Sequence, residues 1–286
     1  KLREFLPKKV KIGVFDGIFE KNEAIWNNFN LIPVCNTLDQ LKFTLNNNIK
    51  SILHVDTGMN RLGLSISEFS DLRNKQNFSR LKNLTLIMSH LSSSDEPNSK
   101  VNNIQIKKFN SLENIFPTIP RSLANSHGIF LGKDSVFNIT RLGIGLYGYV
   151  KYNKNKFKSA VRVLAPILQI RNGEIGDHVG YNATVTLKKK TKIGVLGIGY
   201  ADGFKRILGK RKNLFLGKYK IKILGRISMD TLTVDFTNVP DQVLKKIKYI
   251  PLIDEFYSIS NAAKDCDTIP YEILTSFSNR LKRVYI

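Results

Sequence analysis

Four segments rich in polar residues each follow directly on an apolar run in the first half of the chain. They are 56–61 after the run 52–55, 89–90 after 84–88, 125–126 after 122–124, and 141–145 after 136–140. Ser126 offers a hydroxyl, and Gly143 and Ile144 offer backbone N–H groups. Arg61 and Arg141 add fixed positive charge. Proteins bind phosphate with such donors. Singly, each segment has an ordinary structural explanation, such as a turn or a structural histidine. Together the four segments predict a site for a phosphate-bearing cofactor.

Repeated strand and helix patterns indicate how these segments are brought together. The apolar runs at 10–15, 31–35, 52–55, 84–88 and 122–124, with the stretch 136–140, are continuous rather than alternating, as in strands buried on both faces of a parallel sheet. Helical patterns lie between them, at 65–73 and after Pro97. About six βα units result, whereas a closed barrel of this type needs about eight. We therefore expect an incomplete (β/α)8 TIM-type barrel with the missing pair before Lys1, and functional residues at its carboxyl strand ends.

The second half of the chain has a different pattern. Short strand-like runs at 160–170, 184–187, 193–196, 219–224 and 232–236 are separated by turns that contain glycine. This pattern of short strands and turns predicts a mainly antiparallel β domain. We place the domain boundary between residues 155 and 156, with the polar stretch Tyr152–Lys158 as the linker, and so expect an α/β domain (1–155) followed by an all-β domain (156–286).

Composition limits the possible partners. The chain has 286 residues and a net charge of +22, but its lysines are scattered and no aromatic interleaving accompanies them. We therefore expect solvated faces and no nucleic-acid partner. Two cysteines allow neither a disulfide framework nor a tetrathiolate zinc site, and we expect no metal. No apolar run approaches the ~20 residues of a membrane span. These features predict a cytoplasmic protein with no membrane contact.

An ordered set of motifs resembles the alanine racemase family, whose members are fold-type III pyridoxal-phosphate enzymes. The motifs are His54–Gly63, Ser89–Glu96, Ala124–Ser126, Arg141–Gly148, Gly180–Thr184, Gly197–Gly203, Gly225–Asp230 and Tyr271–Glu272. They occur in the family's order from about residue 50 to residue 272. The resemblance implies pyridoxal 5'-phosphate as cofactor and the interconversion of L- and D-alanine by two bases, which supplies D-alanine for peptidoglycan.

The resemblance also implies roles for individual residues. Cofactor contacts fall on His90, Ser126, Arg141, Gly143 and Ile144, of which Ser126, Gly143 and Ile144 match the phosphate cradle. Arg141 matches the arginine that donates to the pyridine nitrogen, and His90 matches the residue that orients it. Because arginine only donates, that nitrogen stays unprotonated.

On the substrate side, Tyr181 matches the family's catalytic tyrosine. Arg61 matches the arginine near the substrate carboxylate, and Tyr200 and Met229 match groups at the mouth of the site. The family's head-to-tail homodimer implies that Tyr181 serves the partner's cofactor. As a base, Tyr181 needs positive neighbours, and Arg61 is the candidate.

Three departures from the family pattern affect these expectations. The lysine that bonds the cofactor covalently belongs to a motif before Lys1, so we expect an N-terminally truncated chain that is inactive alone. His54 stands where many members carry a lysine, often carbamylated, and Asn279 stands where some carry a phosphate-binding tyrosine. Two alternatives stay open: a racemase for another amino acid, such as serine or lysine, and a non-catalytic barrel protein.

Overall fold

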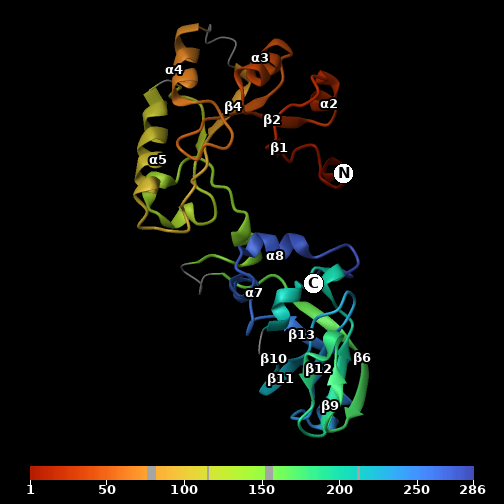
Figure 1. Ribbon diagram of the computed structural model, residues 1–286. Coiled ribbons are helices and arrows are strands. Elements are labelled where there is room, and N and C mark those ends of the chain that lie inside the picture. Colours follow the sequence, from red (N-terminus) through yellow and green to blue (C-terminus); the bar gives the residue numbers. More distant parts are fainter. Residues whose placement is uncertain (76–81, 115, 152–156, 211–212) are drawn as a thin grey trace. The chain divides into compact units, whose positions relative to one another are not determined.

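The computed structural model describes residues 1–75, 82–114, 116–151, 157–210 and 213–286 (Figure 1). The chain forms two compact units, Lys1–Gly143 and Ile144–Ile286. The expected boundary between residues 155 and 156 stays a prediction. Most of the expected linker, 152–156, lies outside the described residues.

The first unit is built on a parallel sheet of five strands in the order β1-β2-β3-β4-β5. The strands are β1 (Ile12–Val14), β2 (Leu31–Cys35), β3 (Ser51–His54), β4 (Leu84–Met88) and β5 (Arg121–Ser122). The helices are α1 (Leu2–Phe5), α2 (Glu23–Asn28), α3 (Leu38–Asn46), α4 (Ile66–Lys75) and α5 (Lys100–Ser111). Because all four pairings are parallel, every strand has its carboxyl end at the same edge of the sheet, as in a βα barrel.

Apolar side chains from strands and helices form the core of this unit. Leu53 and Ile87 of the sheet and Phe69 and Phe109 of the helices are fully buried in one cluster. Thr37 caps α3, since its hydroxyl accepts the N–H of Gln40 at 3.2 Å. The helices and the sheet therefore bury their apolar side chains against each other, and the polar residues at the strand ends lie at the edge of this core.

The prediction of a sixth strand at 136–140 was wrong. The backbone runs beside β5, with N–H bonds from Ile139 to the carbonyl of Arg121 and from Arg141 to that of Ala124. The Asn138 side chain, however, accepts the N–H of Arg121 at 2.9 Å in place of a backbone carbonyl. This interrupts the ladder, which leaves one isolated bridge between Asn125 and Arg141.

The second unit is an antiparallel sheet of six strands in the order β10-β11-β12-β9-β6-β13, and a pair β7-β8 (Figure 1). The strands are β6 (Val163–Gly173), β7 (His178–Val179), β8 (Val185–Thr186), β9 (Thr191–Leu196), β10 (Asn213–Leu216), β11 (Tyr219–Leu224), β12 (Leu232–Asp235) and β13 (Tyr249–Ile253). The helices α6 (Asp241–Leu244), α7 (Ile259–Asp265) and α8 (Pro270–Ser276) follow late in the chain. Phe204, Phe236 and Ile250 lie fully buried in its core.

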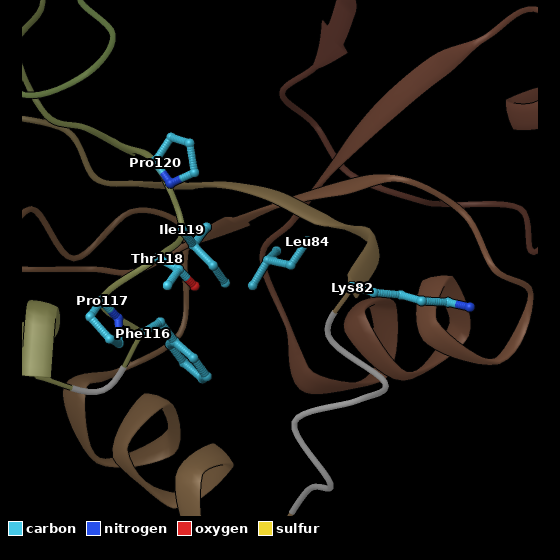
Figure 2. Close-up of a pocket in the computed structure, with 7 residues that line it drawn as sticks. All are labelled: Lys82, Leu84, Phe116, Pro117, Thr118, Ile119 and Pro120. Carbon is cyan, nitrogen blue, oxygen red and sulfur yellow. The ribbon is translucent and has the colours of Figure 1, made fainter.

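A cavity of about 360 Å³ in the first unit lies at the amino ends of β4 and β5 (Figure 2). Leu84 and the segment 116–120 line it, with Lys82 at its side. It is therefore at the opposite edge of the sheet from the polar strand ends. None of the helices in the described ranges is long and apolar enough to cross a membrane.

Candidate active site

Arg141 is the centre of the polar groups at the carboxyl strand ends. Its Nη1 donates to the carbonyl and the hydroxyl of Ser122 at 3.0 and 2.5 Å. Its Nη2 donates to the carbonyls of Ser89 and Leu123 at 2.5 and 3.2 Å. Burial lowers the pKa of Arg141 to about 10, which still leaves it charged at neutral pH. The guanidinium is therefore a cation held in one orientation by backbone dipoles from two strand ends.

His90 completes this arrangement in a defined tautomer. Its Nδ1 lies 3.3 Å from Nη2 of Arg141, and since arginine only donates, this nitrogen accepts. Burial, with the charges of Arg141 and Arg61 next, lowers the pKa of His90 to about 4. A neutral ring that accepts at Nδ1 carries its proton on Nε2.

The donors of Arg141 fit a ligand with an acceptor nitrogen. Both Nη atoms are engaged, whereas Nε–H has no acceptor among the described residues. One directed N–H on a fixed cation suits an unprotonated ring nitrogen such as that of a pyridine. The donor set thus fits the pyridine end of pyridoxal phosphate.

His54 lies at the end of β3, beside Asn36, which follows β2. The ring is 6% exposed, and its Nδ1 is 2.8 Å from the side-chain oxygen of Asn36. Burial is the main cause of a pKa lowered to about 4, and the charge of Arg141 adds to it. Sequence analysis missed Asn36, although it is a polar residue directly after an apolar strand.

The three residues expected to hold a phosphate, Ser126, Gly143 and Ile144, are divided between the two units. In the first unit, the N–H of Gly143 donates to the buried Ser126 hydroxyl at 2.8 Å. In the second unit, the N–H of Ile144 donates to the Tyr271 hydroxyl at 2.6 Å. A hydroxyl that accepts an N–H can still donate its own proton, and the Tyr271 hydroxyl is a donor of this kind. Tyr271, at the start of α8, appeared in the sequence only as part of a motif with no role assigned.

Arg61 lies in a tightly folded loop after β3. One carboxylate oxygen of Asp56 accepts the N–H groups of Gly58 and Met59 at 2.7 and 2.8 Å. Gly63 has a φ of 110°, and a Cβ there would meet the backbone N of Asp56 at 2.9 Å. Arg61 itself is exposed and makes no hydrogen bond or ion pair within the described ranges. Its guanidinium is free to bind an anion.

Three buried polar side chains support this edge of the sheet: Thr57 and Ser89, which lie in segments singled out from the sequence, and Gln105, which sequence analysis missed. Thr57 and Ser89 join hydroxyls at 2.8 Å across the ends of β3 and β4. Gln105 of α5 donates to Thr57 at 3.3 Å and to the carbonyl of His90 at 2.9 Å. The helix thereby fixes the backbone that presents His90.

The remaining predicted residues lie in the second unit. Tyr181 begins the 3-10 turn Tyr181–Ala183 and is 65% exposed. Tyr200 is 44% exposed and lines a cavity of about 520 Å³ together with Lys205 and Arg206. Met229 is 53% exposed, and its carbonyl accepts the N–H of Ala201 at 3.0 Å. The structure thus brings the segments of Tyr200 and Met229 together and leaves the Tyr181 ring open to a ligand or partner.

A parallel βα sheet with polar groups at its carboxyl strand ends, followed by an antiparallel β domain, is the architecture of fold-type III pyridoxal-phosphate enzymes. Family models described as "Alanine racemase, N-terminal domain" and "Alanine racemase, C-terminal domain" match residues 1–151 and 160–285. The chain belongs to the alanine racemase family.

Individual relatives agree with this assignment. The chain is 38% identical over 293 residues to the alanine racemase of Rickettsia bellii, covering 99% of this chain and 72% of that protein. It is 36% identical over 306 residues to that of Brucella abortus, covering 100% of this chain and 77% of that protein.

Among solved structures, the alanine racemase of Bartonella henselae with covalently bound pyridoxal phosphate has a TM-score of 0.88 at 33% identity, over 100% of this chain and 81% of that one. The biosynthetic alanine racemase of Pseudomonas aeruginosa has a TM-score of 0.82 at 26% identity, over 97% of this chain and 80% of that one. These findings confirm the expected fold class, the isomerase class and pyridoxal phosphate as the cofactor.

Proposed function

We propose that His90, Arg141, Arg61 and Tyr181 carry out the interconversion of L- and D-alanine in this family member. The observation that supports the proposal most directly is the arrangement of Arg141, in which both Nη atoms donate hydrogen bonds while Nε–H has no acceptor among the described residues. Pyridoxal phosphate supplies the electron sink that makes the Cα–H bond of a bound amino acid acidic.

The residues on the cofactor side would position the cofactor and set the protonation state of its ring nitrogen. Arg141 would hold the pyridine nitrogen, and Ser126, Gly143 and Ile144 would hold the phosphate. Because Arg141 cannot give up its proton, it keeps the nitrogen unprotonated and limits how far the electron sink acts. His90, neutral and accepting at Nδ1, fixes the rotation of the Arg141 guanidinium. Proton removal then depends strongly on well-placed bases.

Two bases on opposite faces of Cα are needed to invert its configuration. Tyr181 would serve one face, and the lysine expected upstream of Lys1 would serve the other. Arg61 would bind the substrate carboxylate and, with its positive charge, favour the phenolate of Tyr181. Tyr200 and Met229 would contact the substrate at the mouth of the site.

The assembly that we propose is a head-to-tail homodimer in the cytoplasm. An exposed Tyr181 ring supports a role at the partner's cofactor. Residues 1–155 would form the cofactor-binding domain, and residues 156–286 the β domain that carries the catalytic tyrosine. The two cysteines are free thiols, as expected in a reducing compartment.

The test is a racemisation assay on the enzyme that includes the expected upstream segment. With pyridoxal phosphate present, we expect L- and D-alanine to interconvert in both directions, followed by circular dichroism. Serine and lysine serve as competing substrates. If serine or lysine is racemised faster than alanine, that amino acid is the substrate instead. If none of the three is racemised, the proposal is refuted.

A further inference from the structure

Arg280, in the segment that follows α8, joins two turns of the second unit. Its Nη2 donates to a carboxylate oxygen of Asp230, and its Nε lies 3.3 Å from a carboxylate oxygen of Asp202. Asp230 directly follows Met229 in the chain. Asp202 ends the 3-10 turn that begins at Tyr200. One guanidinium thus binds both of the turns that carry residues proposed for the mouth of the site.

The carboxylate of Asp202 distinguishes this contact from an ordinary surface ion pair. Its side chain is 9% exposed. One oxygen accepts the N–H of Gly199 at 2.8 Å, which closes the turn, and the other faces Arg280. Arg280 is the only cation paired with Asp202 in the ranges that the structure describes. Because a buried carboxylate without a counter-charge is costly, the turn depends on Arg280 to keep this conformation.

The two turns also contact each other through their backbones. The N–H of Tyr200 donates to the carbonyl of Ser228 at 3.1 Å. The N–H of Ala201 donates to the carbonyl of Met229 at 3.0 Å. A Cβ at Gly199 would overlap the carbonyl of Met229, so the turns approach as closely as glycine allows. Two backbone hydrogen bonds therefore fix how far apart the side chains of Tyr200 and Met229 lie.

The segment that carries Arg280 is itself anchored on the first of these turns. The N–H of Ser278 donates to the carbonyl of Asp202 at 3.1 Å. The hydroxyl of Ser276 donates to the carbonyl of Gly203, also at 3.1 Å. Gly203 has a φ of 96°, and a Cβ there would overlap the carbonyl of Ser276. Arg280 therefore starts from a fixed point on the first turn and reaches across to the second.

We propose that Arg280 is a positioning residue, which acts through Tyr200 and Met229. By binding Asp202 and Asp230 at once, it holds the two turns together and keeps both side chains at one separation at the mouth of the site. A guanidinium can direct different N–H groups at two carboxylates, whereas the ammonium of a lysine is a single point charge. The proposal rests on the substrate contacts proposed for Tyr200 and Met229.

Amide hydrogen exchange tests this role in the chain of 286 residues, without cofactor or turnover. In Arg280→Gln, the N–H groups of Tyr200 and Ala201 should exchange about 10-fold faster or more, because the turn that carries their acceptors is no longer held. Amides of β9 and β12 should keep their protection. Arg283→Gln is the matched control, since its guanidinium donates to a carbonyl of its own segment at 3.4 Å. Unchanged exchange at Tyr200 and Ala201, or faster exchange throughout the sheet, would overturn the proposal.

Kinetics in the active enzyme separate positioning from stability. Arg280→Gln should raise the KM for alanine about 3- to 10-fold and change kcat by less than about 2-fold, because substrate contacts are lost while the bases stay in place. Arg280→Lys, which restores the charge and can pair with Asp202 alone, should recover part of the loss. Arg283→Gln should leave both constants unchanged. A fall in kcat with no change in KM would overturn the proposal.

A background that lacks both side chains tests whether the effect passes through them. In Tyr200→Ala/Met229→Ala enzyme, Arg280→Gln should raise KM by less than about 2-fold, since the groups that it positions are gone. The full effect of Arg280→Gln on this background would overturn the proposal. If the background alone has the wild-type KM, the proposed substrate contacts fail, and the positioning role fails with them. Unchanged amide exchange would instead overturn the role of Arg280 and leave the substrate contacts intact.

Discussion

Replacement of Tyr181 by phenylalanine tests the two-base reaction most directly. The ring is 65% exposed and its hydroxyl makes no hydrogen bond within the described ranges, so the free energy of unfolding should change by less than about 0.5 kcal/mol. The change removes the one ionisable group on its turn. Loss of a positioned acid or base costs about 10²–10⁴-fold in rate. We expect racemisation to fall by at least that order in both directions.

The assay measures racemisation and proton exchange separately in the active enzyme. Circular dichroism follows the turnover of each enantiomer, and NMR in D2O follows loss of the α-proton. In the variant, exchange of the α-proton should slow less for the enantiomer whose α-proton faces the lysine, because that base is intact. Tyr249→Phe, also an exposed tyrosine of the second unit, is the control. Near-wild-type turnover of both enantiomers by Tyr181→Phe would refute the assignment.

Three further outcomes follow from the same features. Mixed with pyridoxal phosphate, the chain of 286 residues should give no yellow covalent adduct; peptide mapping after borohydride reduction that found the cofactor on one specific lysine would contradict this. The pKa values of His54 and His90 are lowered from 6.5 to about 4, so the unfolded chain binds protons in that window that the folded chain does not. Stability should therefore fall as pH drops from about 6.5 to about 4, and His54→Gln should remove about half of this fall in urea titrations; an unchanged slope would disprove it. Gly194→Ala would overlap the buried Phe236 ring and should lower the free energy of unfolding by about 1–3 kcal/mol in the same assay, whereas Gly13→Ala, where the new Cβ makes an ordinary contact, should cost less; equal effects would contradict the packing argument.

The strands most accurately predicted from the sequence are those with continuous apolar runs. β2, β4 and β11 have the predicted bounds, because runs of Val, Ile and Leu between polar segments leave few alternatives. β13 was missed since Pro251 interrupts its pattern. That strand lies at an edge of its sheet, where the missing N–H of proline is tolerated. Edge position is a property of the whole sheet and is not encoded near Pro251.

In the site, too, some contacts could be predicted from local sequence motifs, whereas others depend on how distant strands pair. Motifs resembling the family identified Arg141 and His90, and their contact is present. The Asn36–His54 contact depends on the pairing of β2 with β3, in which Val34 lies opposite Ile52 and Cys35 opposite Leu53. One more step along this register places residue 36 opposite residue 54. The rule that polar residues after buried strands meet at one edge already covered both positions, and applying it to the second predicted strand would have found the pair. The rule cannot supply the direction of the hydrogen bond, which is set by the carbonyls of Phe15 and Val34: they take the amide N–H2 of Asn36, so its oxygen faces His54 and the proton lies on Nδ1.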